Sequence, residues 1–238
     1  MPYLVAGDQE SYVISTKDKV IGRAIFLEGS YDLHKLLLAV SILEKRGYAL
    51  KHIVDVGSNI GSIVIPAVRR NIFERGTAIE PHPENFKLLC ANLALNGISS
   101  RVTTLSNAVG TESGSTLRML ESVSNSGNHM ISDDGLQVAT IRLDELGIGQ
   151  DGTLLWMDIE GYEGHALAGA PELVSAGVPL VAEYNPGFLR LHDGLEMLES
   201  ILCKHEIFDI GMGGMPTSFK TMRERYEDSA TDFLALRP

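Results

Sequence analysis

The residues best suited to chemistry in this sequence lie in a short glycine-rich segment that directly follows an apolar run. They are Asp55, Gly57, Ser58, Asn59 and Gly61. A glycine turn between a strand and a helix lets a ligand approach the backbone closely, and the positive end of the following helix favours an anionic group. Open α/β sheets bind their ligands at this carboxyl end of the strands, so we expect a ligand at this turn.

A carboxylate follows the turn at a distance that indicates the kind of ligand. Glu80 ends a second apolar run, and an acid roughly 20 residues beyond such a turn is placed to accept hydrogen bonds from the ribose hydroxyls of an adenosine. The spacing G-x-N-x-G is one residue shorter than the dinucleotide fingerprint and gives no good cradle for a pyrophosphate. S-adenosylmethionine, which has a ribose, an adenine and a small carboxylate, meets this description.

Local structural roles remain open for most of these polar residues. Asp55 could cap the end of its strand, and Asn107 could be a turn residue. Asp158, Glu160 and Glu163 could complement a helix dipole.

The histidines form no H-x-x-x-H or H-x-H pattern, so no zinc site is expected. Any of His82, His129 and His165 could instead be a base or a structural residue.

The elements that must position these residues alternate between strands and helices. Apolar or β-branched runs predict strands, and apolar spacings of three and four predict helices, the first capped by Ser30 and ended by Gly47. The expected strands are 52–56, 77–80, 102–105, 154–157, 179–182, 206–210 and 232–236, and the expected helices are 33–43, 60–70, 83–96, 161–170 and 193–204. Such alternation predicts an α/β fold with a mostly parallel sheet covered on both faces.

The remaining segments carry weaker signals. Residues 206–210 and 232–236 should form a closing antiparallel pair, with no helix between them. Residues 113–135 and 211–218 lack periodicity, and we expect loops there, either over the rim of the site or without function. Residues 1–47 are expected to form an N-terminal extension and helix, and residues 48–238 the core of one domain.

Composition and charge limit the partners. The 238 residues include 20 basic and 31 acidic side chains, and the net charge of −11 argues against nucleic acid and against anionic membrane surfaces. No apolar stretch could cross a bilayer and no leader is evident, so a cytoplasmic location is expected. Cys90 and Cys203 lie among apolar neighbours and are predicted to be buried, reduced thiols.

Four segments resemble, in the same order, the FkbM-type methyltransferases. They are residues 55–61, 78–86, 107–110 and 157–170, the last with Asp-Ile-Glu-Gly and a trailing Leu-Ala-Gly-Ala. The resemblance implies a Rossmann-like class I methyltransferase that passes a methyl group from S-adenosylmethionine to a hydroxyl of a small-molecule acceptor, a sugar or secondary metabolite, and leaves S-adenosylhomocysteine. It also implies that Gly57, Asn59 and Gly61 surround the methionine end, with Glu80 on the ribose. Asn107 and Ala108 would then lie near the adenine, and Asp158 beside the methyl donor.

Two mechanisms could activate the acceptor hydroxyl. Asp158, or more distantly His165, could accept its proton. Alternatively, Asp158 could hold a divalent metal ion with Glu183 and Asn185, as in catechol-type O-methyltransferases. The metal-free base is favoured, because Glu183-Tyr184-Asn185 departs from the Asp-Asn pair of those enzymes.

Two other functions compete with methyl transfer. Tyr31 and Lys35 match the Tyr-x-x-x-Lys pair of short-chain dehydrogenases, which would make the chain a nicotinamide-dependent oxidoreductase. This pair precedes the glycine turn instead of following it, and Lys35 could be a solvated helix residue. The second competitor is a non-catalytic module that binds S-adenosylmethionine and regulates a partner.

Overall fold

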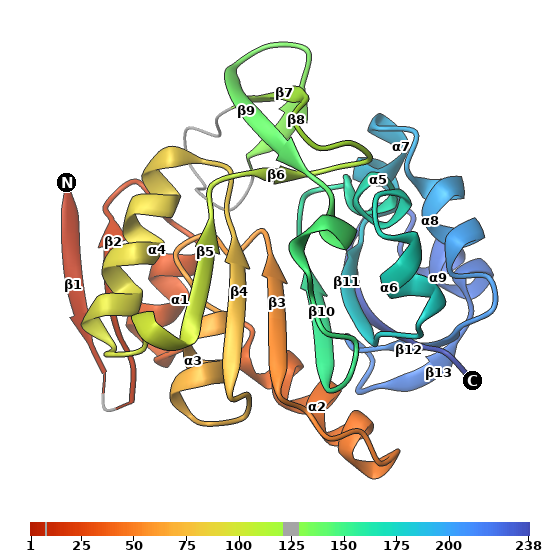
Figure 1. The fold of residues 1–238 in the computed structure, drawn as a ribbon, viewed down its shortest axis with the longest axis horizontal. Coiled ribbons are helices and arrows are strands. Elements are labelled where there is room, and N and C mark those ends of the chain that lie inside the picture. The colour runs from red at the N-terminus through yellow and green to blue at the C-terminus, as the bar shows by residue number, and fades with distance from the viewer. Residues whose placement is uncertain (8, 121–128) are drawn as a thin grey trace.

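An eight-stranded sheet in the order β13-β12-β14-β11-β10-β3-β4-β5 forms the centre of the molecule (Figure 1). The computed structural model describes residues 1–7, 9–120 and 129–238. The five parallel strands are β3 (His52–Val56), β4 (Arg75–Ile79), β5 (Val102–Leu105), β10 (Thr153–Met157) and β11 (Leu180–Tyr184). All five residues of β3 and of β10 are buried, as expected for strands covered on both faces.

Helices cover both faces of this sheet. One face carries α1 (Ile21–Glu28), α2 (Leu33–Lys45), α3 (Val64–Arg69) and α4 (Pro83–Leu95). The other carries α5 (Glu163–Ala168), α6 (Pro171–Ser175), α7 (Pro186–Leu191), α8 (Leu195–Ile201) and α9 (Phe219–Arg225). Alternate strand residues feed the two cores, with Ile53 in the first and Val54 in the second. The predicted Rossmann-like α/β fold is confirmed.

The C-terminal strands reverse the direction of the sheet. β14 (Thr231–Leu236) lies between β11 and β12 (Glu206–Asp209) and runs antiparallel to both, which confirms the predicted closing pair. The expectation that no helix separates these strands was wrong, because β13 (Met215–Thr217) and α9 intervene. Met222 is the one buried residue of α9, so the helix leaves little apolar periodicity in the sequence. β13 also lies within the loop predicted at 211–218.

A second, small sheet stands above the carboxyl edge of the central sheet (Figure 1). It contains β6 (Ala108–Val109), β9 (Leu136–Ile141), β7 (Thr116–Leu120) and β8 (Met130–Ser132), in that order. The loop predicted at 113–135 was therefore wrong where β7 and β8 lie, and its residues 121–128 are outside the described part. Met119 and Val138 are buried while their neighbours are mostly exposed, which gives these strands a weak pattern.

An N-terminal hairpin of β1 (Pro2–Ala6) and β2 (Ser11–Ser15), which the sequence did not predict, packs on α4. Asn92 of α4 acts as a backbone mimic: its Oδ1 accepts from Val13 N at 2.6 Å, and its Nδ2 donates to Ile60 O at 3.0 Å. Arg70 donates two hydrogen bonds of 2.8 Å to the buried Glu10. These contacts connect the hairpin to the glycine turn.

Several local expectations differ from the structure. α3 begins at Val64 and not at residue 60, because positive φ angles at Asn59 and Gly61 keep the turn out of the helix. Two helix ends also changed: Asp32 and not Ser30 is the N-cap of α2, and α5 spans only Glu163–Ala168.

The cysteine prediction was wrong for Cys203, which is exposed just after the C-cap of α8, and Cys90 is only half-buried. None of the described helices has both the length and the apolar character that crossing a membrane requires.

Candidate active site

The glycine turn is held tightly between β4 and the end of β10. Gly57 has φ +84°, and a Cβ built on it would lie 2.0 Å from the carbonyl oxygen of Asp158. Its N–H and that of Ser58 donate to Ile79 O at 2.9 and 3.0 Å. Only glycine combines this conformation with such a close approach of a neighbouring strand. The turn therefore brings the ends of β3, β4 and β10 together.

Asp55, in the strand before the turn, stabilises the turn through a hydrogen bond to the start of α3. Its Oδ2 accepts a 3.1 Å hydrogen bond from Val64 N at the start of α3, and the side chain is 2% exposed. Burial raises the pKa of Asp55 to about 7, although the Val64 N–H opposes the shift. This contact gives Asp55 the local structural role that the sequence left open.

Glu80 stands directly across from the turn. Its Oε2 accepts from Asn59 N and its Oε1 from His82 N, both at 2.8 Å. Burial raises the pKa of Glu80 to about 7, and the two N–H donors oppose that rise. The carboxyl group is thus held in one orientation beside the glycine turn, with lone pairs left for a further donor.

A cavity with about 550 Å³ of space, part of it open to solvent, lies above these groups. Its polar wall includes Glu80, Asn107, Asp158, Glu160 and Tyr162, and its apolar wall includes Val56, Ile79, Val109, Met119 and Ile131. Met119 and Ile131 come from the small sheet, which therefore roofs this first cavity.

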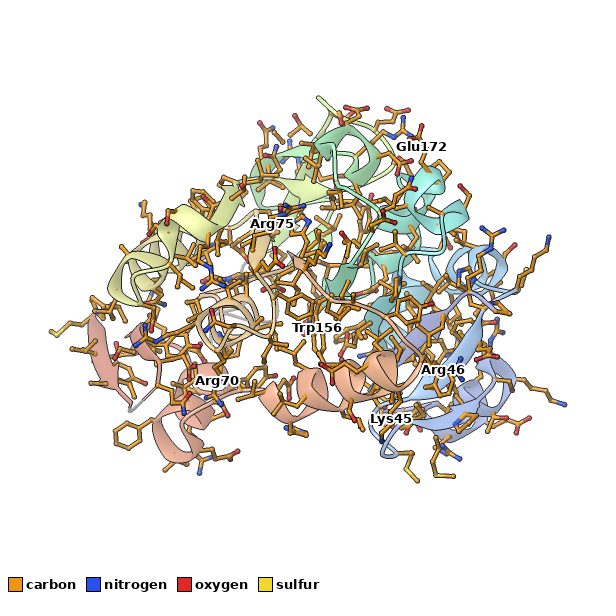
Figure 2. The ribbon with its side chains drawn as sticks, turned by 60° about the horizontal axis from the view of Figure 1, so that its bottom comes forward. Lys45, Arg46, Arg70, Arg75, Trp156 and Glu172 are labelled. Carbon is orange, nitrogen blue, oxygen red and sulfur yellow. The ribbon has the colours of Figure 1, made fainter. Side chains whose placement is uncertain are left out.

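A second cavity of about 520 Å³ adjoins the first, and both are lined by Gly57, Asn59, Asp158 and Glu160. N-terminal residues close its far side: Ile21, Tyr31 and Asp32. Trp156 of β10, in the middle of the molecule (Figure 2), forms part of its wall. Residues 1–47 thus help to build the site.

The two cavities have an acidic wall. Asp32, Asp55, Glu80, Asp158 and Glu160 line them, and no lysine or arginine is among their described lining residues. Burial, and secondarily the charges of Asp232 and Asp32, raises the pKa of Asp158 to about 7. Burial and the Asp158 charge raise the pKa of Glu160 to about 8.

Lys35 supplies positive charge just outside the second cavity. Its Nζ lies 3.0 Å from Asp32 Oδ2 and 2.6 Å from Asp232 Oδ2, and its side chain is 27% exposed. The interpretation of Lys35 as a solvated helix residue was therefore wrong. The ion pair joins α2 to β14 and neutralises part of the acidic wall.

The other residues selected from the sequence have diverse surroundings. Ala108 is buried beside Asn107, whose Nδ2 donates to Ala139 O at 3.4 Å, and both line the first cavity. Gly61 lines neither cavity, and a Cβ there would lie 2.6 Å from Ile65 and 3.0 Å from Leu89. Any side chain at position 61 would thus clash with the side chains of Ile65 in α3 and Leu89 in α4.

The histidines are held by rings and backbone. His165 Nε2 is 2.6 Å from His192 O, its ring stacks on Tyr162 with centroids 4.4 Å apart, and it lines neither cavity. His82 and His129 stack with centroids 4.1 Å apart, which connects the start of α4 to the small sheet. Of these three, only His129 lines the first cavity.

Some lining residues were not selected from the sequence. Tyr162 lies within the 157–170 segment and could have been found there, whereas Trp156, Met119 and Ile131 carry only an apolar signal. Within the described residues, no group of three or more His, Cys, Asp and Glu side chains is arranged to hold a metal ion. Asn185 uses its Oδ1 to accept from Phe188 N at 3.2 Å and so caps α7.

Comparisons with known proteins agree with this geometry. Residues 55–205 match the family model described as the methyltransferase FkbM domain. The crystal structure of methyltransferase FkbM from Methylobacillus flagellatus KT is similar over 79% of this chain and 44% of that chain, with 21% identity and a TM-score of 0.52. This chain therefore spans less than half of that protein's length.

M. jannaschii TYW2, crystallised in complex with AdoMet, is similar over 100% of this chain and 87% of that one, with 12% identity and a TM-score of 0.51. At these identities the two structures establish the fold. Among curated proteins, the search found no significant match.

Proposed function

The chain belongs to the FkbM methyltransferase family, and from this membership we propose that it transfers the methyl group of S-adenosylmethionine to a hydroxyl of a small acceptor, a sugar or secondary metabolite. The observation that carries the proposal is the first cavity, where the ends of β3, β4 and β10 and the segment after β5 meet. We also propose that the chain acts as one domain, since Ile21, Tyr31 and Asp32 of the N-terminal extension line the second cavity.

The residues present fit this cofactor. Glu80 is held by two backbone N–H groups with lone pairs free for ribose hydroxyls. Asn107 and the apolar wall of the first cavity provide a flat, partly polar surface for an adenine. The second cavity then takes the methionine end, with Ser62 on its wall as a hydroxyl donor. The two cavities share Gly57 and Asn59, so one extended ligand can occupy both.

The charge of the wall favours this cofactor over a nicotinamide dinucleotide. S-adenosylmethionine carries a sulfonium and an ammonium group, and carboxylates such as Asp158 and Glu160 attract both. A pyrophosphate would face these same carboxylates, with no described arginine or lysine on the wall to neutralise it. Tyr31 and Asp32 belong to the second cavity, but Lys35 is occupied by two aspartates, which does not support a dehydrogenase pair.

Asp158 is the proposed proton acceptor. When bound, the cofactor supplies an electrophilic methyl group. Asp158 lines both cavities, whereas His165 lines neither and is bonded to a backbone carbonyl. A raised pKa of about 7 lets the Asp158 carboxylate take up a proton near neutral pH, which is the range that suits a general base. The remaining acceleration would come from holding the acceptor oxygen in line with the methyl group.

The proposal is tested in two steps. Titration calorimetry should detect binding of S-adenosylhomocysteine and none of NAD. Radiolabelled methyl transfer from S-adenosylmethionine should then be measured with a panel of sugars and hydroxylated secondary metabolites. Binding without turnover on any acceptor would favour the non-catalytic module, and binding of NAD alone would favour the oxidoreductase.

A further inference from the structure

A third cavity lies along the edge strand β5, from the amino ends of β3 and β4 to Leu105 at the carboxyl end of β5. It contains about 1040 Å³ of space, part of it open to solvent, and it covers the amino ends of β3, β4 and β5. His52 is the first residue of β3, while Val56 at the other end borders the first cavity. Five residues of strand span about 15 Å, so His52 lies far from the first cavity, and the two cavities share no described lining residue.

Two arginines with uncompensated charge line this third cavity. Arg101 donates to the carbonyl oxygens of Phe73 and Glu74 at 2.9 and 2.8 Å, and to Asn71 Oδ1 at 3.0 Å. These acceptors are neutral, so they fix the guanidinium without cancelling its charge. Two of its five N–H groups stay available.

Arg75 is the second arginine. Its guanidinium makes no hydrogen bond or ion pair with any described residue. A Cβ built on Gly149 would lie 4.0 Å from an Arg75 Nη, so the guanidinium lies beside the loop before β10 (Figure 2). Gly76 pairs with Val102, which makes Arg75 and Arg101 neighbours at the starts of adjacent strands. Glu74 is the one acid on the described wall.

A buried histidine adds an unfilled polar position to this wall. His52 is 6% exposed, and its Nε2 lies 2.9 Å from Thr77 Oγ1. Its Nδ1 is buried and has no hydrogen-bond partner among the described residues. Depending on the tautomer, Nδ1 either donates or accepts. A hydroxyl group can complement both forms, because it is donor and acceptor at once.

We propose that this third cavity binds a small organic phosphate that also carries a hydroxyl group. Guanidinium groups match phosphate oxygens in geometry and charge, and two of them on an otherwise acidic protein favour an anion here. Leu105, Leu146 and Ile148 also line the cavity and provide contacts for a carbon skeleton, which inorganic phosphate lacks. The hydroxyl would lie beside His52, one of the lining residues.

Calorimetry on the full chain tests the proposal with glucose 6-phosphate and glycerol 3-phosphate as probes, and with inorganic phosphate and glucose as the separated parts. At least one phosphate ester should bind more tightly than either part. Arg75→Gln should weaken that binding about tenfold or more. Thr103→Glu, which adds a carboxylate on the exposed wall of the cavity, should abolish it. Arg190→Gln removes the same charge from an exposed site on α7 and should change nothing.

Three results would overturn the proposal. The first is no saturable binding of either ester up to about 10 mM. The second is an affinity for the ester that does not depend on this cavity as proposed. Inorganic phosphate would then bind as tightly as the ester, or the ester would still bind to both Arg75→Gln and Thr103→Glu proteins whose fold is intact by circular dichroism. The third is competition with saturating S-adenosylhomocysteine, since that would locate the esters in the candidate active site.

Discussion

Replacing Glu80 by glutamine changes one charge in the proposed ribose site and little of its shape. Glutamine keeps one of the two acceptor oxygens that face Asn59 N and His82 N. Hydrogen bonds to a charged acceptor contribute about 1.5–3 kcal/mol, so S-adenosylhomocysteine should bind roughly 10- to 150-fold more weakly at pH 8. Titration calorimetry measures this, and thermal unfolding verifies the fold.

The pH dependence makes this prediction sharper. Burial raises the pKa of Glu80 to about 7 in the free protein, and ribose hydroxyls that donate to the carboxylate favour its charged form, which lowers that pKa on binding. Binding to the wild-type protein should therefore release protons below pH 7. Its affinity should be greatest above pH 7 and fall as the pH drops through 7, by at most about tenfold per unit.

Glu80→Gln has no titratable carboxyl group at position 80, so its affinity for S-adenosylhomocysteine should depend less on pH. The difference in affinity between the wild-type and variant proteins should therefore be smaller at pH 6 than at pH 8. Glu84→Gln, on the exposed first turn of α4, is the matched control and should behave as wild type. A folded Glu80→Gln protein with wild-type affinity at pH 8, or with unchanged proton release, would refute the role of Glu80.

Four further predictions concern the acids and the turn. Asp158→Asn should reduce methyl transfer at least about 100-fold while S-adenosylhomocysteine still binds. Full activity of this variant would exclude Asp158 both as base and as metal ligand. Inhibition of the wild-type protein by EDTA that magnesium reverses would favour the metal mechanism. Gly57→Ala should lower the free energy of unfolding, measured in urea, by about 3 kcal/mol or more, because the added Cβ would clash with the Asp158 carbonyl oxygen. The control Gly97→Ala should lower it by only about 1 kcal/mol, since φ is +69° there but no atom lies within 4 Å of the added Cβ. Equal losses in the two variants would contradict the clash. Lys35→Met should cost about 1–3 kcal/mol at pH 7 and less at lower pH, because burial raises the pKa of Asp232 and its protonated form needs no cation; a pH-independent loss in urea titrations would argue against the ion pairs. Burial raises the pKa values of Asp55 and Glu80 to about 7, so the folded state binds more protons than the unfolded state between about pH 4 and 7. The stabilising contribution of these two groups should therefore be lost as the pH rises through that window. Urea titrations at several fixed pH values measure this, and an Asp55→Asn protein whose free energy of unfolding changes with pH as steeply as that of the wild type would count against it.

Short apolar or β-branched runs bounded by turns were the easiest elements to predict. β3 and β5 have the predicted bounds, because a short apolar run between a polar segment and a glycine or polar turn leaves little freedom for its ends. The β7–β9 strands were missed because their residues are mostly exposed and pair only with one another and with the two-residue strand β6. What stabilises them is tertiary, so no local pattern identifies them.

The candidate site divides in the same way. The turn and Glu80 were selected because each follows a recognisable strand, whereas Asn107 and Asp158 were selected from the resemblance to the FkbM-type methyltransferases, and the structure gathers all of them around one cavity. Their roles stay predictions. The walls contributed by Tyr31 and Met119 depend on how the N-terminal extension and the small sheet fold back over the sheet. The local spacing of residues in the sequence does not indicate how the N-terminal extension and the small sheet pack against the central sheet.

The acidic wall explains why a fold would keep so many costly groups. Burying an isolated carboxylate is unfavourable, and proteins respond by raising its pKa so that it stays protonated. The pKa of Asp158 is raised to about 7 and that of Glu160 to about 8, so near neutral pH a small change in environment decides their charge. A cationic ligand would stabilise the ionised forms of these carboxylates, so its binding free energy would offset the stability that their burial costs the protein. The same acids that weaken the free protein would thereby select a positively charged cofactor over a phosphorylated one.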